Sequence, residues 1–216
     1  MAEDRLNTWE VLFQRALELI DSANASDARL EDWSFGGGTV LMRRHHHRFS
    51  KDVDIFVSDP QYLGYLSPRL NTQEERMASG YDEQANYVKL YFSEGEIDFV
   101  AAAPLTKNAT VIEHLFGRDV QVETSTEIVA KKVWHRGVVF TARDILDLAM
   151  VVEKEPEALT SIRPILRDRR QVILERIAQH GGGLREVFDA LETLEYRRSF
   201  DECITLVTHA LDTASK

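Results

Sequence analysis

Two stretches, Gly36-Gly37-Gly38-Thr39 and Arg48-Phe49-Ser50-Lys51-Asp52-Val53-Asp54-Ile55-Phe56, carry the strongest structural signal in this sequence. The three glycines permit a tight turn, and Thr39 is suited to cap a helix over residues 39–44. Val53 and Ile55 alternate with Asp52 and Asp54, which is the spacing of a β-strand. Because side chains two residues apart point to the same face of a strand, we expect Asp52 and Asp54 to project side by side.

Neighbouring carboxylates of this kind favour a bound cation. Two such charges repel each other, and a divalent cation with a preference for oxygen ligands relieves the repulsion. A second predicted strand, residues 96–100, carries Asp98. If the two strands are neighbours, Asp98 adds a third carboxylate to Asp52 and Asp54. The glycine turn at the start of a helix offers backbone N–H groups to a phosphate, so the combination suits phosphoryl transfer.

The chain as a whole is predicted to divide into an α/β half and a helical half. Apolar spacing predicts a helix over residues 5–22, and short strands are expected over 30–35, 53–57, 87–92, 96–100 and 120–123. Residues 58–85 are polar and predict loops with a helical excursion. Helices are expected over 126–134, 142–152, 158–180, 184–195 and 200–212, with Thr141 to Asp144 as a capping box and Gly181 to Gly183 as a break. We therefore expect domains over residues 1–125 and 126–216.

Composition and charge limit the class of protein. The net charge is −10, which does not favour nonspecific binding of nucleic acid, so such binding needs a local basic surface. The single cysteine, Cys203, excludes an intrachain disulfide, and the longest apolar run, residues 99–105, is too short to span a bilayer. We expect a cytoplasmic protein. Basic residues gather in three places: Arg43, Arg44, Arg48 and Lys51; Lys131, Lys132 and Arg136; and Arg163, Arg167, Arg169 and Arg170.

The segment from Gly36 to Phe56 resembles the first motif of the nucleotidyltransferase AbiEii/AbiGii toxin family. That motif combines Gly-Gly-Thr, a helix, and His-Arg-x-Ser-x-Asp-x-Asp-x-Phe. Further along, Glu96-Ile97-Asp98 resembles the strand with the third acid. The segment from Glu127 to Lys132, followed by Arg143-Asp144-Ile145-Leu146-Asp147-Leu148, resembles the later lysine and Arg-Asp motifs, and the register favours Lys132 as the lysine. The matching residues of the first motif are Gly37, Gly38, Thr39, His47, Arg48, Ser50, Asp52, Asp54 and Phe56.

The resemblance implies a polymerase-β-like nucleotidyltransferase core with a small mixed sheet, followed by a C-terminal helical region. It implies an NTP substrate, Mg²⁺ or Mn²⁺ as the metal, and an RNA acceptor such as a tRNA 3′ end or a protein acceptor. It also implies the toxin of a toxin–antitoxin pair, with an antitoxin protein as partner. The rival interpretation is a catalytically weak nucleotide-binding or protein-interaction module of the same fold.

Each candidate residue has an expected role and a structural alternative. Asp52, Asp54 and Asp98 are expected to bind metal, with exposed strand acids as the alternative. Asp98 is also a candidate base for the acceptor hydroxyl. Gly37, Gly38 and Thr39 are expected to hold phosphates, with a plain helix entry as the alternative.

The remaining candidates are mostly basic. Lys132 is expected to neutralise the triphosphate, and Asp144 either holds Lys132 or the acceptor, or stabilises a helix start. Arg48 and Ser50 either contact phosphate or support the acidic strand. Trp134 is assigned to core or interface, with base stacking as an alternative.

Overall fold

The computed structural model describes residues 5–25, 30–70 and 78–215. The chain divides into two compact units. We call the first the sheet unit: residues up to Val40, Ser50–Pro104 and Thr110–Glu123. The second, the helical unit, consists of Leu41–Phe49, Leu105–Ala109 and Thr124 onward. Each unit is therefore assembled from segments that are separated in the sequence.

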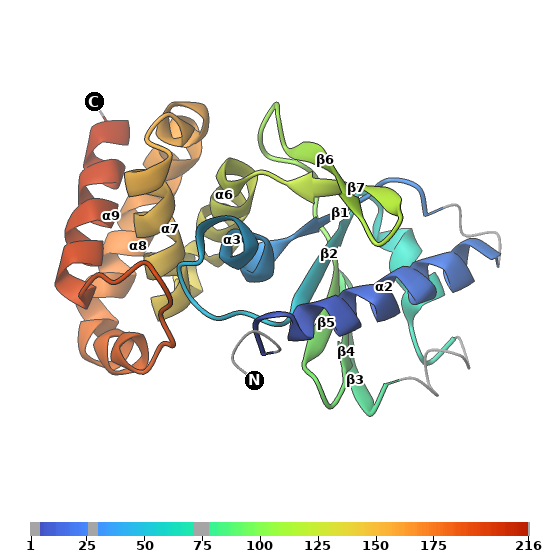
Figure 1. The fold of residues 1–216 in the computed structure, drawn as a ribbon. Helices are drawn as coiled ribbons and strands as arrows, with labels where there is room; N and C mark the ends of the chain where they lie inside the picture. The colour runs from blue at the N-terminus through green and yellow to red at the C-terminus, as the bar shows by residue number, and fades with distance from the viewer. Residues whose placement is uncertain (1–4, 26–29, 71–77, 216) are drawn as a thin grey trace. The chain divides into compact units, whose positions relative to one another are not determined.

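The sheet unit contains a seven-stranded mixed sheet, with strand order β3-β4-β5-β2-β1-β7-β6 among the described residues (Figure 1). Strands β2 and β5 are parallel, as are β1 and β7, and the other neighbouring pairs are antiparallel. The strands are β1 (Trp33–Gly36), β2 (Val53–Val57), β3 (Gly80–Gln84), β4 (Tyr87–Tyr91), β5 (Glu96–Ala101), β6 (Thr110–Leu115) and β7 (Arg118–Glu123). The prediction of a mixed α/β fold with a mixed sheet is confirmed.

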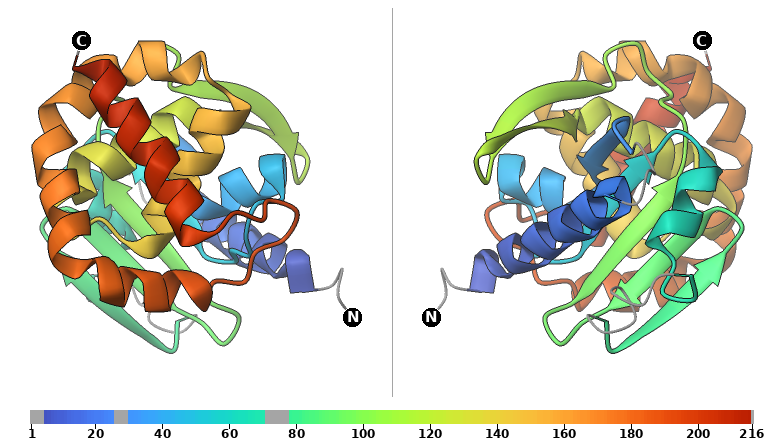
Figure 2. Two further views of the ribbon diagram at one scale, coloured as in Figure 1. Left: turned by 90° about the vertical axis from the view of Figure 1, so that its left-hand side faces the viewer. Right: turned by 90° about the vertical axis from the view of Figure 1, so that its right-hand side faces the viewer.

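One face of this sheet is apolar and covered. Helix α2 (Thr8–Ala25) packs on β2 and β5, and the short helix α4 (Leu63–Leu66) packs on β4 and β5. The right-hand view of Figure 2 shows α2 lying along the sheet. Inward side chains alternate with half-buried ones along each central strand, as a sheet covered on one side requires. Phe13 of α2 contacts Phe35 of β1 with ring centroids 4.5 Å apart, within a fully buried core.

The helical unit is built around α7 (Ala142–Lys154). This helix is buried from Asp144 to Val152 and packs against α6 (Ser125–Arg136), α8 (Ala158–Asp189) and α9 (Phe200–Ala214). The left-hand view of Figure 2 shows α9 lying beside α8. The capping box predicted at Thr141 is present, because Thr141 and Asp144 exchange side-chain and backbone hydrogen bonds.

Helix α3 (Gly37–His45) begins directly after β1, and the chain that follows it belongs to the helical unit up to Phe49. There, residues 46–49 pair with the segment after α8. The backbone N–H of Leu194 donates to His47 O at 3.0 Å, and the N–H of Phe49 donates to Glu192 O at 2.8 Å. This pairing holds the segment in place against the helices. The 3₁₀ turns η1 (Pro60–Tyr62) and η2 (Gly137–Val139) complete the described elements.

Two details differ from the sequence analysis, and a third prediction falls partly outside the described residues. The break predicted at Gly181 to Gly183 is wrong, because α8 runs through all three glycines to Asp189. Strands β3 and β6 were not predicted; both lie at the edges of the sheet and are mostly half-exposed or exposed, so neither shows clear alternation. Part of the segment predicted as loops with a helical excursion, residues 71–77, lies outside the described residues.

No helix in the described parts of the chain combines the length and apolar character needed to cross a membrane.

Candidate active site

Asp54 and Asp98 face each other on the side of the sheet away from α2. Strands β2 and β5 are parallel neighbours, and their register pairs Asp54 directly with Asp98. The residues on either side of them, Val53, Ile55 and Ile97, are fully buried in the opposite, apolar face. Strand alternation thus directs both carboxylates to the half-exposed face. The neighbouring strands predicted for these two acids are confirmed.

Asp98 lies in an environment that disfavours its ionised form. Burial, and secondly the charge of Asp54, raise the pKa of Asp98 to about 7. Lys89, its register partner on β4, opposes this shift, with Lys89 Nζ 3.2 Å from Asp98 Oδ2. Asp98 Oδ1 is buried and, among the described residues, accepts no hydrogen bond. A buried acceptor without a donor is costly, so this oxygen is suited to an additional ligand.

Lys89 supplies the positive charge of this face. Its ammonium also donates a hydrogen bond to Glu96 Oε2 at 2.7 Å. Burial lowers the pKa of Lys89, but the contacts with Glu96 and Asp98 outweigh burial and raise it above its ordinary value. Lys89 therefore remains charged and fixes the position of Asp98 from the β4 side.

Asp52 precedes β2 by one residue and is anchored to the start of β5. Its Oδ1 accepts a hydrogen bond from the backbone N–H of Glu96 at 3.1 Å. The spacing of two residues between Asp52 and Asp54 is the spacing of one strand face. One carboxylate oxygen of Asp52 thus accepts a backbone hydrogen bond, and this contact does not involve the other oxygen.

The glycine turn packs directly on Asp54. Gly37 has φ +74°, and a Cβ atom placed on it would lie 1.9 Å from Asp54 Oδ2. Only glycine combines that backbone conformation with so close an approach. The N-terminus of α3 therefore lies beside the Asp54 carboxylate, within the sheet unit.

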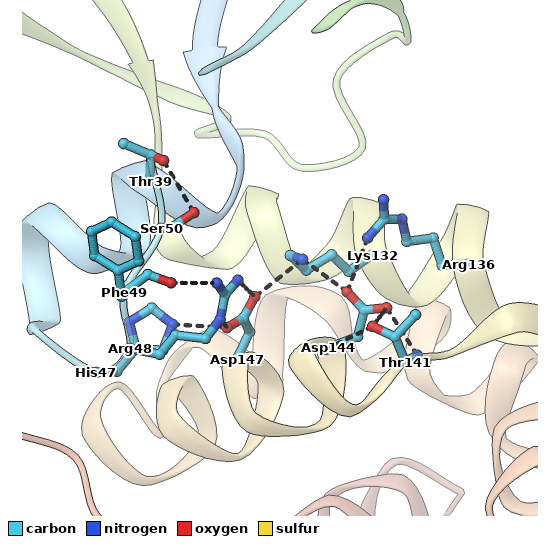
Figure 3. A network of polar contacts seen from close by, with 10 residues as sticks. All are labelled: Thr39, His47, Arg48, Phe49, Ser50, Lys132, Arg136, Thr141, Asp144 and Asp147. Carbon is cyan, nitrogen blue, oxygen red and sulfur yellow. Dashed lines mark hydrogen bonds and ion pairs between the residues drawn. The ribbon is translucent and has the colours of Figure 1, made fainter. Parts of the chain in front are cut away.

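Thr39 fastens the turn to the acidic strand. Its side chain is fully buried, and its hydroxyl donates to the Asp52 carbonyl at 2.5 Å. Thr39 Oγ1 also lies 3.1 Å from Ser50 Oγ, a contact visible in Figure 3. These two contacts join the glycine turn to the segment that leads into Asp52. Support of the acidic strand is one of the two roles that the sequence left open for Ser50.

The donor set on this face fits a divalent cation. Asp54 and Asp98 are hard oxygen donors held close together, and Asp98 has an oxygen without a hydrogen-bond donor. A cation would relieve the repulsion that raises the pKa of Asp98. Across the described ranges, no group of three or more His, Cys, Asp or Glu side chains is arranged as a metal site. Asp52 would thus have to approach the other two acids to complete one.

The remaining predicted residues meet in the helical unit. Lys132 of α6 has its Nζ 2.8 Å from Asp144 Oδ1 and 3.1 Å from Asp147 Oδ2, both on α7 (Figure 3). The contact between Lys132 and Asp144 is one of those expected from the sequence. The pKa of Lys132 is raised: burial lowers it, but the two aspartates outweigh burial. Lys132 is thus held as a cation among fixed carboxylates.

Asp144 combines two of the roles that the sequence offered. Its Oδ2 accepts hydrogen bonds from the backbone N–H and the hydroxyl of Thr141, which completes the capping box. Its Oδ1 contacts Lys132 and also Arg136 Nη1, the latter at 3.3 Å. The side chain is fully buried, and burial raises its pKa, but Lys132 and Arg136 lower it below its ordinary value.

Asp147 was not identified as a site residue by the sequence analysis. Its buried carboxylate receives Arg48 through Nε at 2.7 Å and Nη2 at 2.9 Å, and His47 Nε2 lies 2.7 Å from its Oδ1. Burial raises the pKa of Asp147, but Arg48, Lys132 and His47 together hold it well below its ordinary value. Two signals were available. Asp147 lies within the segment that resembles the family's Arg-Asp motif, and it lies three residues after Asp144, on the same side of a helix whose other buried residues are apolar.

These contacts separate the predicted residues by unit. Gly37, Gly38, Thr39, Ser50, Asp52, Asp54 and Asp98 belong to the sheet unit, whereas Arg48, Lys132 and Asp144 belong to the helical unit. Within the helical unit the Arg48 side chain is almost fully buried and its guanidinium is bound by Asp147.

Comparison with known proteins finds solved structures to which this chain is similar. The structure is similar to MenT4, a nucleotidyltransferase toxin from Mycobacterium tuberculosis, with a TM-score of 0.53 and 17% identity over 96% of this chain and 84% of that one. It also matches JHP933 from Helicobacter pylori, with a TM-score of 0.49 and 13% identity over 92% of each chain. No curated protein sequence matches the chain. The family model described as nucleotidyl transferase AbiEii toxin, type IV toxin–antitoxin system, matches residues 22–215. The chain therefore belongs to the AbiEii family of nucleotidyltransferase toxins.

Proposed function

We propose that this nucleotidyltransferase moves a nucleoside monophosphate from an NTP to a hydroxyl group of an RNA acceptor and releases pyrophosphate. The observation that carries the proposal is the pair of opposed carboxylates, Asp54 and Asp98, beside the glycine turn at Gly37. Acids on adjacent strands next to a helix N-terminus suit a substrate that brings both phosphate and cation.

In this proposal Asp54 and Asp98, completed by Asp52, hold Mg²⁺ or Mn²⁺. The bound cation supplies positive charge that neutralises the phosphates. Asp98 is also the candidate base that accepts the proton of the attacking hydroxyl. The bond formed joins the acceptor oxygen to the α-phosphorus, and the bond broken releases pyrophosphate.

The phosphates are assigned to the beginning of α3. Backbone N–H groups of Gly37, Gly38 and Thr39 lie at the positive end of the helix dipole. Lys132 is proposed to act as a fixed positive charge, oriented by Asp144. Arg48 and Ser50 are proposed to support these segments, since both side chains already contact protein groups.

Incorporation of radiolabel tests this function. The purified chain is incubated with total RNA and each α-labelled NTP in turn, with Mg²⁺, with Mn²⁺ and with chelator. We expect label in RNA with one NTP or a subset, and none with chelator. Asp54→Asn should lower incorporation by about a hundredfold or more, because metal stabilisation of transition-state charge contributes several kcal/mol.

The matched control is Asp119→Asn, the same change at a strand residue whose side chain is 75% exposed. It should label like wild type. Incorporation that survives Asp54→Asn would contradict the assigned site. Retained NTP binding without incorporation into RNA or protein would favour the rival, a nucleotide-binding or interaction module, and label in protein alone would replace RNA as the acceptor.

We also propose, from its family, that the chain acts in the cytoplasm as a toxin restrained by an antitoxin. Induced expression should then arrest growth, whereas Asp54→Asn at equal expression should not. Growth arrest by the inactive variant would separate toxicity from nucleotidyl transfer.

A further inference from the structure

A seam between α6, η2 and α8 in the helical unit combines arginines with exposed apolar side chains. Along α8, Arg169, Val172 and Arg176 follow one another on successive turns. The Arg169 guanidinium lies 4.2 Å from the ring centroid of Trp134 on α6. A Cβ placed on Gly137 of η2 would lie 3.2 Å from Val172 Cγ1, and Arg176 Nε donates to Phe140 O at 3.5 Å. The two chain segments thus run side by side along this seam.

The arginines of the seam lack carboxylate partners. Within the described part of the chain Arg169 and Arg176 form no ion pair, and Arg169 Nε is buried without a hydrogen-bond acceptor. The other arginines of α8 that face elsewhere differ, since Arg167 pairs with Asp168 and Arg170 with Asp212. In a chain with net charge −10, two uncompensated arginines two turns apart on one face of a helix form a local positive site.

The acids of α8 next to the seam have other partners. Asp168 pairs with Arg167, and Glu175 accepts a hydrogen bond from Gln171 at 2.6 Å. The pKa of His135, next to Trp134, is lowered, first by burial and then by the charges of Lys131 and Arg169. Because these acids of α8 are engaged elsewhere, the uncompensated charge along the seam is positive.

Apolar surface lies directly beside this charge. Val138 is 69% exposed, Val139 is 58% exposed and Trp134 is 36% exposed. Aromatic and apolar groups next to arginines without carboxylate partners suit single-stranded nucleic acid. The bases of a single strand stack on aromatic rings, and its phosphates contact guanidinium groups. A protein partner would use the apolar groups equally well, but it would have to supply acids for both arginines.

We propose that this seam binds single-stranded nucleic acid and, in the reaction assigned above, the RNA acceptor. The choice of RNA rests on the proposed function; the choice of a single strand rests on the seam itself. Trp134 receives a base, Arg169 and Arg176 contact phosphates, and Val138 and Val139 cover the neighbouring base or ribose.

Fluorescence anisotropy with the full chain tests the seam without any NTP. The probe is a fluorescein-labelled, unstructured RNA of about 12 nucleotides, within the usual site size of single-strand binding surfaces. Trp134→Ala should weaken affinity by about tenfold, the loss of one stacked base. Arg169→Gln should weaken affinity and reduce the slope of log affinity against log salt by about one, the loss of one phosphate contact.

Matched controls separate the seam from general effects of charge and folding. Arg167→Gln removes the same charge from the other side of α8 and should bind like wild type. Val139→Glu should abolish binding, whereas Val187→Glu, at a position of α8 that is 57% exposed, should not. Circular dichroism and thermal unfolding show that each variant is folded, and both valine positions are exposed enough to accept the change.

The outcomes distinguish the two proposals. If RNA is labelled but the seam variants bind and react like wild type, the seam proposal is wrong and the proposed function stands. If RNA binding depends on the seam but no NTP yields label, the seam proposal stands alone. Equal affinity for a duplex of the same sequence, or a protein partner whose capture depends on Val139 while RNA affinity does not, would overturn it.

Discussion

Asp147 is a single carboxylate that serves His47, Arg48 and Lys132 inside the helical unit. Asp147→Asn keeps the shape of the side chain but leaves Arg48 and Lys132 without its charge. Removing one partner of a buried ion pair costs about 3–5 kcal/mol. We expect a loss of that size in the free energy of unfolding, measured by urea denaturation.

The comparison for Asp147 is Asp201, which pairs with Arg185 at the surface. Asp201→Asn should change stability little, since exposed ion pairs contribute weakly. If both variants lose a similar free energy of unfolding, burial does not explain how much the Asp147 ion pairs stabilise the protein.

Gly37 is the residue where backbone conformation and the acidic pair meet. Gly37→Ala would place a methyl group 1.9 Å from Asp54 Oδ2 at φ +74°, so the Asp54 carboxylate must move. We expect nucleotidyl transfer to fall at least tenfold, in keeping with the loss expected when reacting groups are displaced by about 1 Å. The measurement is the initial rate of label incorporation.

Gly64→Ala is the control for Gly37, because its added Cβ would meet only Leu70 Cδ1, at 3.9 Å. It should react like wild type. If Gly37→Ala is fully active, nucleotidyl transfer does not require the observed position of the Asp54 carboxylate.

At the scale of elements, α8 is continuous where the sequence predicted a break at its three glycines. A Cβ on Gly182 would meet nothing within 4 Å. Gly182→Ala should therefore stabilise the protein by roughly 0.5–1 kcal/mol, the difference in helix propensity. Chemical denaturation measures this gain.

Gly117 is the control position for Gly182. It also has open space around its Cβ position, but its φ is +78°. Gly117→Ala should destabilise the protein, since alanine resists this backbone conformation. The opposite signs of the two changes would show that conformation decides the outcome; equal signs would contradict that explanation.

The elements that could be predicted from sequence are those with a local signal. Helix α7 begins at the capping box of Thr141, and β2 shows its alternation around Asp54. Strand β6 gives no such signal, because Val111 and Ile112 are both exposed at a sheet edge. Helix α8 was divided at Gly181 to Gly183 because glycine propensity is local, whereas the helix is stabilised by packing against α6, α7 and α9.

The residues of the candidate site also divide into those with a local sequence signal and those without one. The pairing of Asp54 with Asp98 followed from two strands that sequence spacing could indicate. The role of Asp147 did not, because its partners Arg48 and His47 precede it by about a hundred residues and only the tertiary fold joins them. Long-range ion pairs of this kind leave no periodic trace in a sequence.

At the scale of the whole molecule, the buried aspartates predict acid sensitivity. Cations lower the pKa of Asp144 and Asp147 below 3.8, so below that pH the unfolded chain binds protons that the folded chain does not. Their stabilisation is complete above pH 3.8 and is lost as pH falls toward their folded pKa values. Each can contribute a slope of at most about 1.4 kcal/mol per pH unit.

Urea denaturation at a series of pH values from about 5 down to about 2.5 measures this slope. Asp147→Asn removes one titrating group and should give a shallower dependence than wild type. An identical slope in the variant would assign the acid sensitivity to other carboxylates.

The discontinuous make-up of the helical unit has a consequence for synthesis. Arg48 leaves the ribosome 99 residues before Asp147, a delay on the order of 5–20 s at ordinary elongation rates. During that interval α7 is incomplete, so the guanidinium of Arg48 has no Asp147 carboxylate to pair with. Nascent chains stalled before α7 should accordingly expose the segment from Leu41 to Phe49 to protease, and chains stalled after α9 has emerged should protect it.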